Sequence, residues 1–313
     1  MSIALDPAET AEPAPEPEPE PGPEQPAADA PAPPNVSVWT TGVALTVLGA
    51  LLLGFLGVVW VIGSLRHSRD QQVEYADFRY ALANASAPVG PLDVNGHVVT
   101  PGTPVALLDI PELGLREVVA EGTSSQVLMS GPGHLPGTVL PGQAGVSVIM
   151  ARRVLFGGPF HYLDQMHATD TFTVTTGQGV SRYRVLDVRH ANDPVPASPT
   201  SNEGRLTLMT ADGPAFLPTD IVRVDAELIS KVQPTPPRLF DTNPPSEQAM
   251  AGDPTAWMPL VLWAQALVLA AIGLTWARLR WGSRQAWLVG VPTLAVLGLA
   301  VADQVARLLP NLM

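Results

Sequence analysis

Three long apolar stretches limit what this chain of 313 residues can fold into. The first, Thr40 to Ser64, has no charged residue and is long enough to cross a hydrocarbon core about 30 Å thick. The other two are Thr255 to Ala277 and Ala286 to Ala302. All seven Trp lie inside or beside these stretches, as Trp does in the aromatic belts of membrane interfaces. We therefore predict three transmembrane helices, with a buried soluble hairpin as the less favoured alternative for the last two stretches.

The first stretch is expected to be retained as a membrane anchor. A secretory signal has a positively charged start, a shorter apolar core and a small-residue cleavage site, whereas here the preceding residues are acidic and the apolar run is longer. Residues 1–35 hold eight Asp and Glu and no Lys or Arg. They are also rich in Pro and Ala, so they have little apolar surface to offset the entropy cost of folding. We predict a disordered tail that acts as a spacer, with a docking role as the alternative.

Arginines next to the apolar stretches predict the orientation. Arg278, Arg280 and Arg284 lie between the last two stretches, and such positive residues favour the cytoplasmic side. This places the acidic tail in the cytoplasm and the central domain on the extracellular side. Arg66 and Arg69 favour the opposite orientation, but the arginines of the hairpin are the denser signal. We predict a multi-pass protein of the plasma membrane.

Composition excludes several kinds of function. The chain has no Cys, so it forms no disulfide and carries no thiol. Its six His are scattered without the spacing of metal ligands, and we predict no metal and no cofactor. No cluster of basic residues points to a nucleic-acid partner.

Short β-like runs, separated by Gly, Pro and Asp, fill the region between the first and second apolar stretches. A helix is expected first, over Arg69–Asn84. Thr171–Thr175 and Tyr183–Val185 alternate in polarity as half-buried strands do, with Thr176–Gly179 as the turn between them. The brevity and spacing of the runs favour an all-β fold, a closed barrel of about eight strands with short helices. Strands are expected at 104–110, 115–120, 147–151, 171–175, 181–188, 204–209 and 221–228.

These elements predict the domain organisation of the chain. The barrel is preceded by a juxtamembrane helix and loop and followed by a proline-rich linker. The predicted segments are a disordered tail (1–37), transmembrane helix (38–64), juxtamembrane segment (65–103), β-barrel (104–231), linker (232–254) and two transmembrane helices (255–277 and 286–306).

Several motifs of the central domain occur together in one known family. They are Val105–Leu115, Glu121–Thr123, Gly131–Thr138, Pro141–Gly142, Phe156–Phe160 with Leu163 and Asp164, Thr175–Gly179 and Arg205–Thr210. In this order and at this spacing, they make residues 70–230 resemble a sortase of class E, the actinobacterial class. The resemblance implies a sortase-like β-barrel. For an active member it also implies a thiol transpeptidase that attaches surface proteins in Gram-positive bacteria.

The departures from the family pattern fall on the residues that carry its chemistry. Where the family has approximately Ala-Gly-His-Arg, this chain has Met150–Arg153, so Arg152 stands at the histidine position. Ala211 stands at the position of the thiol nucleophile. The catalytic arginine of the family corresponds to the region of Asp220, and Arg223 lies nearby on the same predicted strand. The resemblance therefore implies a catalytically degenerate sortase.

Hydroxyl groups at Thr207, Thr210 and Ser147 are possible substitutes for the thiol. A hydroxyl nucleophile needs an adjacent base, and the guanidinium of Arg152 cannot be one because it stays protonated at neutral pH. We interpret His134 as a structural residue and His161 as a surface residue, while His190 has no partner visible in the sequence.

The expected peptide groove has a cationic floor. Asp212 could form an ion pair with either arginine of the Arg152–Arg153 pair, and an ordinary turn residue is the alternative interpretation of Asp212. Such a floor would favour an acidic peptide or a carboxylate. The predicted groove residues are Arg152, Arg153, Thr210, Asp212 and Arg223.

The sequence leaves three functions open. The favoured one is an inactive sortase homologue that binds or helps assemble cell-surface proteins, with a surface protein or its sorting-signal peptide as partner. The second is a transpeptidase or peptidase with a nucleophile other than Cys. The third is a membrane scaffold, in the lipid bilayer, whose last two helices recruit co-encoded membrane proteins.

Overall fold

The computed structural model of the chain describes residues 54, 57–239, 244–281 and 283–313. The predicted acidic tail (1–37) and most of the first predicted transmembrane helix (38–64) lie outside the described residues. The α-helices are α2 (Gly63–Ala83), α3 (Trp257–Trp281) and α4 (Ser283–Leu308). The short helical elements are η1 (Val58–Ile62, a π-helix), η2 (Pro111–Leu113), η3 (Val127–Met129), η4 (Leu163–Gln165), η5 (Pro245–Glu247) and η6 (Pro254–Ala256).

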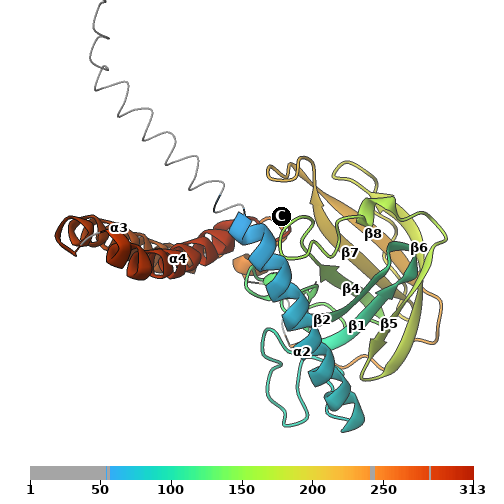
Figure 1. Ribbon diagram of the computed structural model, residues 1–313. Coiled ribbons are helices and arrows are strands. Elements are labelled where there is room, and N and C mark those ends of the chain that lie inside the picture. Colours follow the sequence, from blue (N-terminus) through green and yellow to red (C-terminus); the bar gives the residue numbers. More distant parts are fainter. Residues whose placement is uncertain (1–53, 55–56, 240–243, 282) are drawn as a thin grey trace, which may run out of the picture. The chain divides into compact units, whose positions relative to one another are not determined.

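The central domain is a closed barrel of eight strands in the order β1-β2-β3-β4-β7-β8-β6-β5 (Figure 1). This confirms the closed β-barrel of about eight strands expected from the sequence. The strand bounds are β1 (Pro104–Ile110), β2 (Leu115–Glu121), β3 (Gly133–His134), β4 (Gly145–Met150), β5 (Thr171–Thr176), β6 (Gly179–Arg189), β7 (Gly204–Asp212) and β8 (Asp220–Leu228).

Alternate residues of the strands fill the barrel interior. On β5, Phe172 and Val174 point inward, and the ring of Phe172 stacks on that of Tyr183 from β6 at a centroid distance of 5.5 Å. On β7, Leu206 and Leu208 belong to the same core. Because side chains alternate along a strand, Thr207, Met209 and Ala211 of β7 face the outside of the barrel.

Two strands differ from the prediction made from the sequence: one was not predicted, and one is longer than predicted. The segment Gly133–His134 was not among the expected strands, but it forms β3, which pairs parallel with β2 and antiparallel with β4. Two residues are too few to show a strand periodicity. The strand expected at 204–209 continues to Asp212, which pairs with Asp220. Residues 210–212 are therefore held in the sheet.

Helix α2 begins earlier than the expected Arg69 and lies against β1 and β2 (Figure 1). Gln71 extends the hydrogen bonding of β2, since its amide accepts from the Val118 N–H (2.8 Å) and donates to the Val118 carbonyl (3.1 Å). Phe78, further along the helix, packs in a buried cluster with Val118. These contacts fix the helix on the barrel wall.

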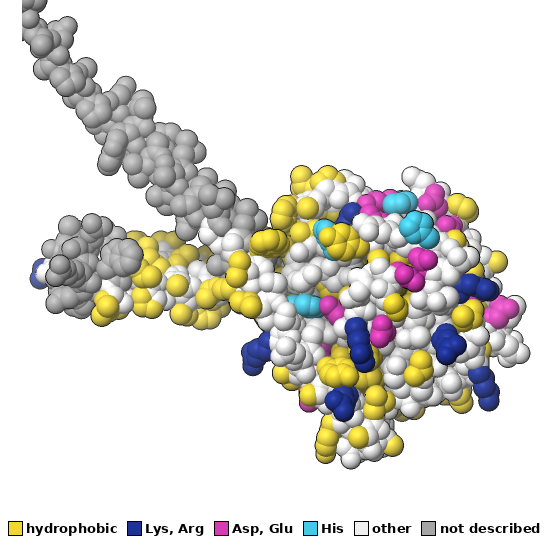
Figure 2. Space-filling model, turned by 45° about the vertical axis from the view of Figure 1, so that its right-hand side comes forward, with side chains coloured by type: hydrophobic (Ala, Val, Ile, Leu, Met, Phe, Trp, Pro, Cys, Tyr) yellow, Lys and Arg dark blue, Asp and Glu magenta, His cyan; other side chains and the backbone are white. Residues whose placement is uncertain are grey.

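Helices α3 and α4 are each long and apolar enough to cross a membrane, over Pro254–Leu274 and Leu288–Leu308. They lie side by side, and their apolar side chains, such as Leu269 and Val296, are exposed (Figures 1 and 2). The cationic turn expected between them is shorter than predicted. Helix α3 runs to Trp281, so Arg278 and Arg280 belong to its last turn.

Candidate functional site

The parallel pairing of β4 with β7 brings the two altered family positions together. Met150, the last residue of β4, lies opposite Met209 of β7. The chain after β4 therefore runs beside the end of β7, and the Ala151 N–H donates to the Met209 carbonyl (3.1 Å). Met150 and Ala211 belong to one apolar cluster outside the barrel interior. We call the surface of this cluster, at the ends of β4 and β7, the groove, because it lies at the position of the peptide groove expected from the sequence.

Arg152 is the largest fully buried side chain among the described residues. Its Nη2 donates to the carbonyl and the hydroxyl of Ser125 (3.2 and 2.8 Å), and its guanidinium lies over the ring of Phe156 (5.1 Å to the centroid). Within the described part of the chain, Nε and Nη1 have no hydrogen-bond partner. Burial lowers the pKa of Arg152 to about 9, so the side chain is still a cation at neutral pH and cannot accept a proton.

Arg153, next in sequence, is well paired. Its Nη1 lies 3.1 Å from Oδ1 of Asp212, and its Nη2 lies 3.5 Å from Oδ2 of Asp164. Of the two arginines considered from the sequence as partners of Asp212, the structure thus uses Arg153. The pKa of Asp212 lies below its usual value because partial burial, which disfavours the carboxylate, is outweighed by the Gly213 N–H, His190 and Arg153.

Two further groups gather at the start of β8. His190 Nδ1 lies 2.8 Å from Asp212 Oδ2, and one ligand atom each from His190, Asp212 and Asp220 fall within 4.8 Å of one another. Sequence spacing did not predict this cluster, because residues 190 and 212 are brought together by the sheet. Asp220 accepts from the backbone N–H of Ala191 (2.9 Å) and Asp212 is paired with Arg153, so both carboxylates already have hydrogen-bond partners. Arg223 donates to the carbonyl of Ile221 (3.3 Å) on the outer face of β8.

The three hydroxyls considered as nucleophiles point elsewhere. Thr210 donates to the Ala151 carbonyl (2.9 Å), and Thr207 donates to Oδ1 of Asp225 (2.6 Å). Ser147 is buried, and alternation places its side chain on the interior face of β4. Within the described residues, none of the three hydroxyls is hydrogen-bonded to a histidine. His161 instead interacts through Nδ1 with the Arg153 carbonyl (3.0 Å).

The groove holds residues from the far end of the sequence. Residues 309–313, which we call the α4 tail, follow helix α4 and return to the barrel, where Figure 1 marks this end of the chain. Leu312 is 0% exposed and packs in the cluster that contains Met150 and Ala211. Its carbonyl accepts from the Arg153 N–H (3.0 Å). Met313 packs in a neighbouring cluster with Phe156.

Asn311 locks the α4 tail to the segment that precedes α3. Its backbone N–H donates to the Ala251 carbonyl (2.8 Å), and its side-chain amide donates to the carbonyls of Ser246 (2.7 Å) and Gln248 (2.8 Å). The end of α4 approaches this segment closely, since a Cβ added to Gly252 would lie 2.4 Å from the Leu308 oxygen. No role was assigned to the tail from the sequence, where its apolar residues were the only available signal.

The segment before α3 is itself anchored to the loop that holds Arg152. Glu247 is buried, and its carboxylate accepts from the backbone N–H and the hydroxyl of Thr123. Ser125, two residues on, accepts from Arg152. The tail, the segment and the loop therefore form one connected network around the groove.

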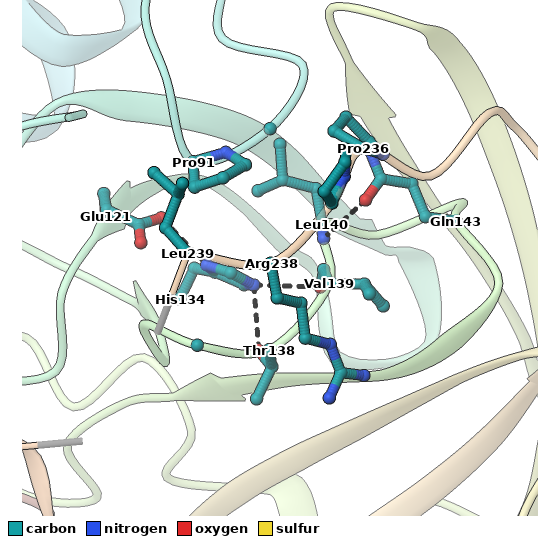
Figure 3. Close-up of a pocket in the computed structure, with 13 residues that line it drawn as sticks. Pro91, Glu121, His134, Thr138, Val139, Leu140, Gln143, Pro236, Arg238 and Leu239 are labelled. Carbon is teal, nitrogen blue, oxygen red and sulfur yellow. Dashed lines mark hydrogen bonds and ion pairs between the residues drawn. The ribbon is translucent and has the colours of Figure 1, made fainter. Parts of the chain in front are cut away.

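A second feature, a cavity of about 30 Å³, lies beside His134 (Figure 3). Glu121, Thr138 and Arg238 contribute to its lining. A volume of this size holds about one or two water molecules, not a peptide side chain. His134 Nδ1 lies 2.8 Å from Oε2 of Glu121, and Nε2 lies 3.0 Å from the Val139 carbonyl, the latter contact dashed in Figure 3. These contacts fit the structural role expected for His134.

The His134–Glu121 pair makes stability depend on pH. Burial alone would lower the pKa of His134, but Glu121 and the Val139 carbonyl raise it above its ordinary value of 6.5. A raised histidine pKa stabilises the folded state fully below the unfolded pKa, and this contribution is lost as pH rises through the folded pKa. We expect the midpoint of thermal unfolding to fall by a few degrees between about pH 6 and pH 9. In His134→Gln the unfolding midpoint should depend less steeply on pH. An unchanged dependence would assign the titration to other groups such as His67, whose pKa is also raised because Glu117 outweighs burial.

The part of the chain that resembles known proteins is the central domain. Residues 108–227 match the family model of the sortase domain. Similar solved structures include a sortase D5 transpeptidase of Clostridium perfringens, with 22% identity over 53% of this chain and 100% of that chain and a TM-score of 0.43. Another is a variant of sortase E of Streptomyces avermitilis, with 27% identity over 42% of this chain and 91% of that chain and a TM-score of 0.35. A third is sortase C of Clostridium perfringens with the C-terminal cell wall sorting motif, with 21% identity over 52% of this chain and 89% of that chain and a TM-score of 0.39. No curated protein matches the chain. The barrel region is thus similar to a sortase domain, and the match covers less than half of the chain.

Proposed function

We propose that this chain is a membrane-anchored, catalytically inactive sortase-like protein that binds or helps assemble cell-surface proteins. The observation that carries the proposal is the pair of residues at the family's reactive positions. Ala211 has no nucleophilic atom, and Arg152 is a buried cation that can neither accept a proton nor reach solvent. Thiol transpeptidation needs a nucleophile and a base that activates it, and this pair supplies neither.

The hydroxyl groups do not replace the lost thiol in this proposal. The hydroxyl of Thr210 is committed to the Ala151 carbonyl, and that of Ser147 lies toward the barrel interior. An active Ser or Thr nucleophile would need a base within hydrogen-bonding distance. Neither hydroxyl has one among the residues that the structure describes.

Membrane anchorage is supported by the two helices α3 and α4, which are long and apolar enough to cross a membrane, and the contacts at their ends bear on the orientation. The Asp253 N–H, just before α3, donates to the Arg307 carbonyl near the end of α4 (2.9 Å). Arg66 of α2 pairs with Asp303 of α4 (3.0 Å). Both ends of the α3–α4 hairpin therefore lie on the barrel side. With the arginines of its turn in the cytoplasm, the barrel is extracellular and the acidic tail is cytoplasmic.

The proposal is tested with the full chain in detergent and a fluorescent sorting-signal peptide. We expect no cleavage above that of peptide alone, with or without an amine acceptor, and the same result for Thr210→Val and Ser147→Ala. Cleavage that either substitution abolished would support a hydroxyl nucleophile and would overturn the proposal. Copurification with a surface protein that carries a sorting signal tests the binding role, because the scaffold hypothesis predicts that the hairpin alone retains such partners.

A further inference from the structure

We propose that the α4 tail is a built-in ligand of the groove, which holds the groove closed to other peptides until the tail is withdrawn. The ligand that the groove accepts is then a short apolar segment in which Asn precedes Leu. This inference rests on the proposed function, because it concerns the same groove. It adds the chemical class of the ligand and the condition for binding an outside peptide or surface protein, which is withdrawal of the tail from the groove.

The contacts of the tail are those of a bound peptide. One backbone hydrogen bond joins the tail to the chain after β4, from the Arg153 N–H to the Leu312 carbonyl, and another joins Asn311 to Ala251. Backbone hydrogen bonds with side chains in separate pockets are a general mode of peptide recognition. Here Leu312 packs in the buried cluster that contains Ala211, and Met313 packs in the neighbouring cluster that contains Phe156.

The residues of the pocket match the size of this ligand. Ala211 is 3% exposed and shares a buried cluster with Leu312, where a larger side chain at position 211 would compete for the same space. The alanine therefore has a packing role in addition to being a lost nucleophile. Asn311 supplies polar recognition, because both of its side-chain amide bonds go to backbone carbonyls that would otherwise lose a donor.

The tail also connects the groove to the membrane hairpin. Leu309 follows the last residue of α4, and α4 is held near the barrel by the pair between Arg66 and Asp303. A shift of α4 relative to the barrel would withdraw Leu312 from the cluster. Opening of the groove is thus coupled to the position of a helix that could span the membrane.

The absence of Cys from the sequence allows a direct test. Ala211→Cys gives the full chain a single thiol, whose rate of reaction with a maleimide reports access to the groove. We expect this thiol to react at least about tenfold more slowly than that of Ser201→Cys, an exposed turn position. Burial of one leucine side chain shifts the equilibrium between the occupied and the open groove by roughly tenfold to a hundredfold. Adding Leu312→Asp, or deleting residues 311–313, should raise the rate toward the exposed reference.

Two controls keep the test specific. Leu217→Asp, at an exposed loop leucine, should leave the rate unchanged. In the deletion variant, a synthetic peptide of residues 307–313 should protect the thiol again, and the same peptide with Leu312→Asp should not. A fast reaction in the full chain, a rate unaffected by removal of the tail, or a failure of the peptide to protect would each overturn the inference. Because the thiol reaction involves neither peptide cleavage nor a surface-protein partner, these outcomes are distinguishable from a failure of the proposed function. If the deletion variant does not fold, the smaller change Leu312→Ala replaces it in the test, after cooperative unfolding of that variant has been checked.

Discussion

Arg152→Met is expected to stabilise the protein. Among the described residues, the buried guanidinium has no carboxylate partner, so its lost hydration is offset by the hydrogen bonds to Ser125 and the contact with Phe156. Replacement of buried charges by apolar side chains of similar volume is often stabilising by about 1–4 kcal/mol. We expect a gain at the lower end of this range, since Ser125 loses a donor. The measurement is the free energy of unfolding of the full chain in detergent.

Arg153→Met is the matched control for this prediction. The two arginines are adjacent, but Arg153 is paired with Asp212 and Asp164 and is partly exposed. Its replacement should lower the free energy of unfolding by about 1–3 kcal/mol, because the carbonyl of Ala211 and the carboxylate of Asp212 lose a charged donor. A loss of stability in both variants would contradict the expectation that burial of the Arg152 guanidinium is a net cost to the folded state.

Arg189→Met is expected to cause the largest loss of stability. Arg189 of β6 pairs with Asp225 of β8, and their side chains are only 8% and 3% exposed. Thr207 also donates to Asp225. Removing the arginine leaves a buried carboxylate without its counter-charge, which costs about 3–5 kcal/mol. Chemical denaturation of the variant would measure this loss directly.

Arg184→Met provides the comparison on the same two strands. Arg184 pairs with Glu227, but these side chains are 50% and 37% exposed. An exposed ion pair contributes about 0–1 kcal/mol, so this variant should unfold almost as the parent does. Equal losses for Arg189→Met and Arg184→Met would show that burial does not decide the strength of these pairs.

Much of the fold could be predicted from the sequence because local patterns specify it. The alternation in Thr171–Thr175 and the Gly-containing turn after it define β5 and the start of β6 within a residue or two. The two last apolar stretches likewise correspond to α3 and α4. By contrast, β3 has only two residues and owes its existence to its neighbours β2 and β4. Such a strand has no signal of its own.

The candidate site was predictable only in part. Motif order placed Arg152 and Ala211 next to the groove, as the parallel pairing of β4 and β7 then requires. The partners of these residues could not be read from the sequence. Arg152 donates a hydrogen bond to Ser125, a residue outside the motifs of the sequence analysis. Leu312 packs in the cluster of Ala211 although it lies 101 residues further along the chain (312 − 211). Contacts at such separations depend on the tertiary fold.

The most direct test of the account concerns one backbone amide in the groove. The Arg153 N–H donates to the carbonyl of Leu312, so its hydrogen exchange reports whether the α4 tail occupies the groove in solution. We predict that this amide is protected in the full chain and exchanges much faster when residues 311–313 are deleted, while the Leu208 amide in the barrel sheet stays protected. Exchange of the Arg153 amide at the rate of an unstructured peptide in the full chain would contradict a groove closed by the chain's own tail.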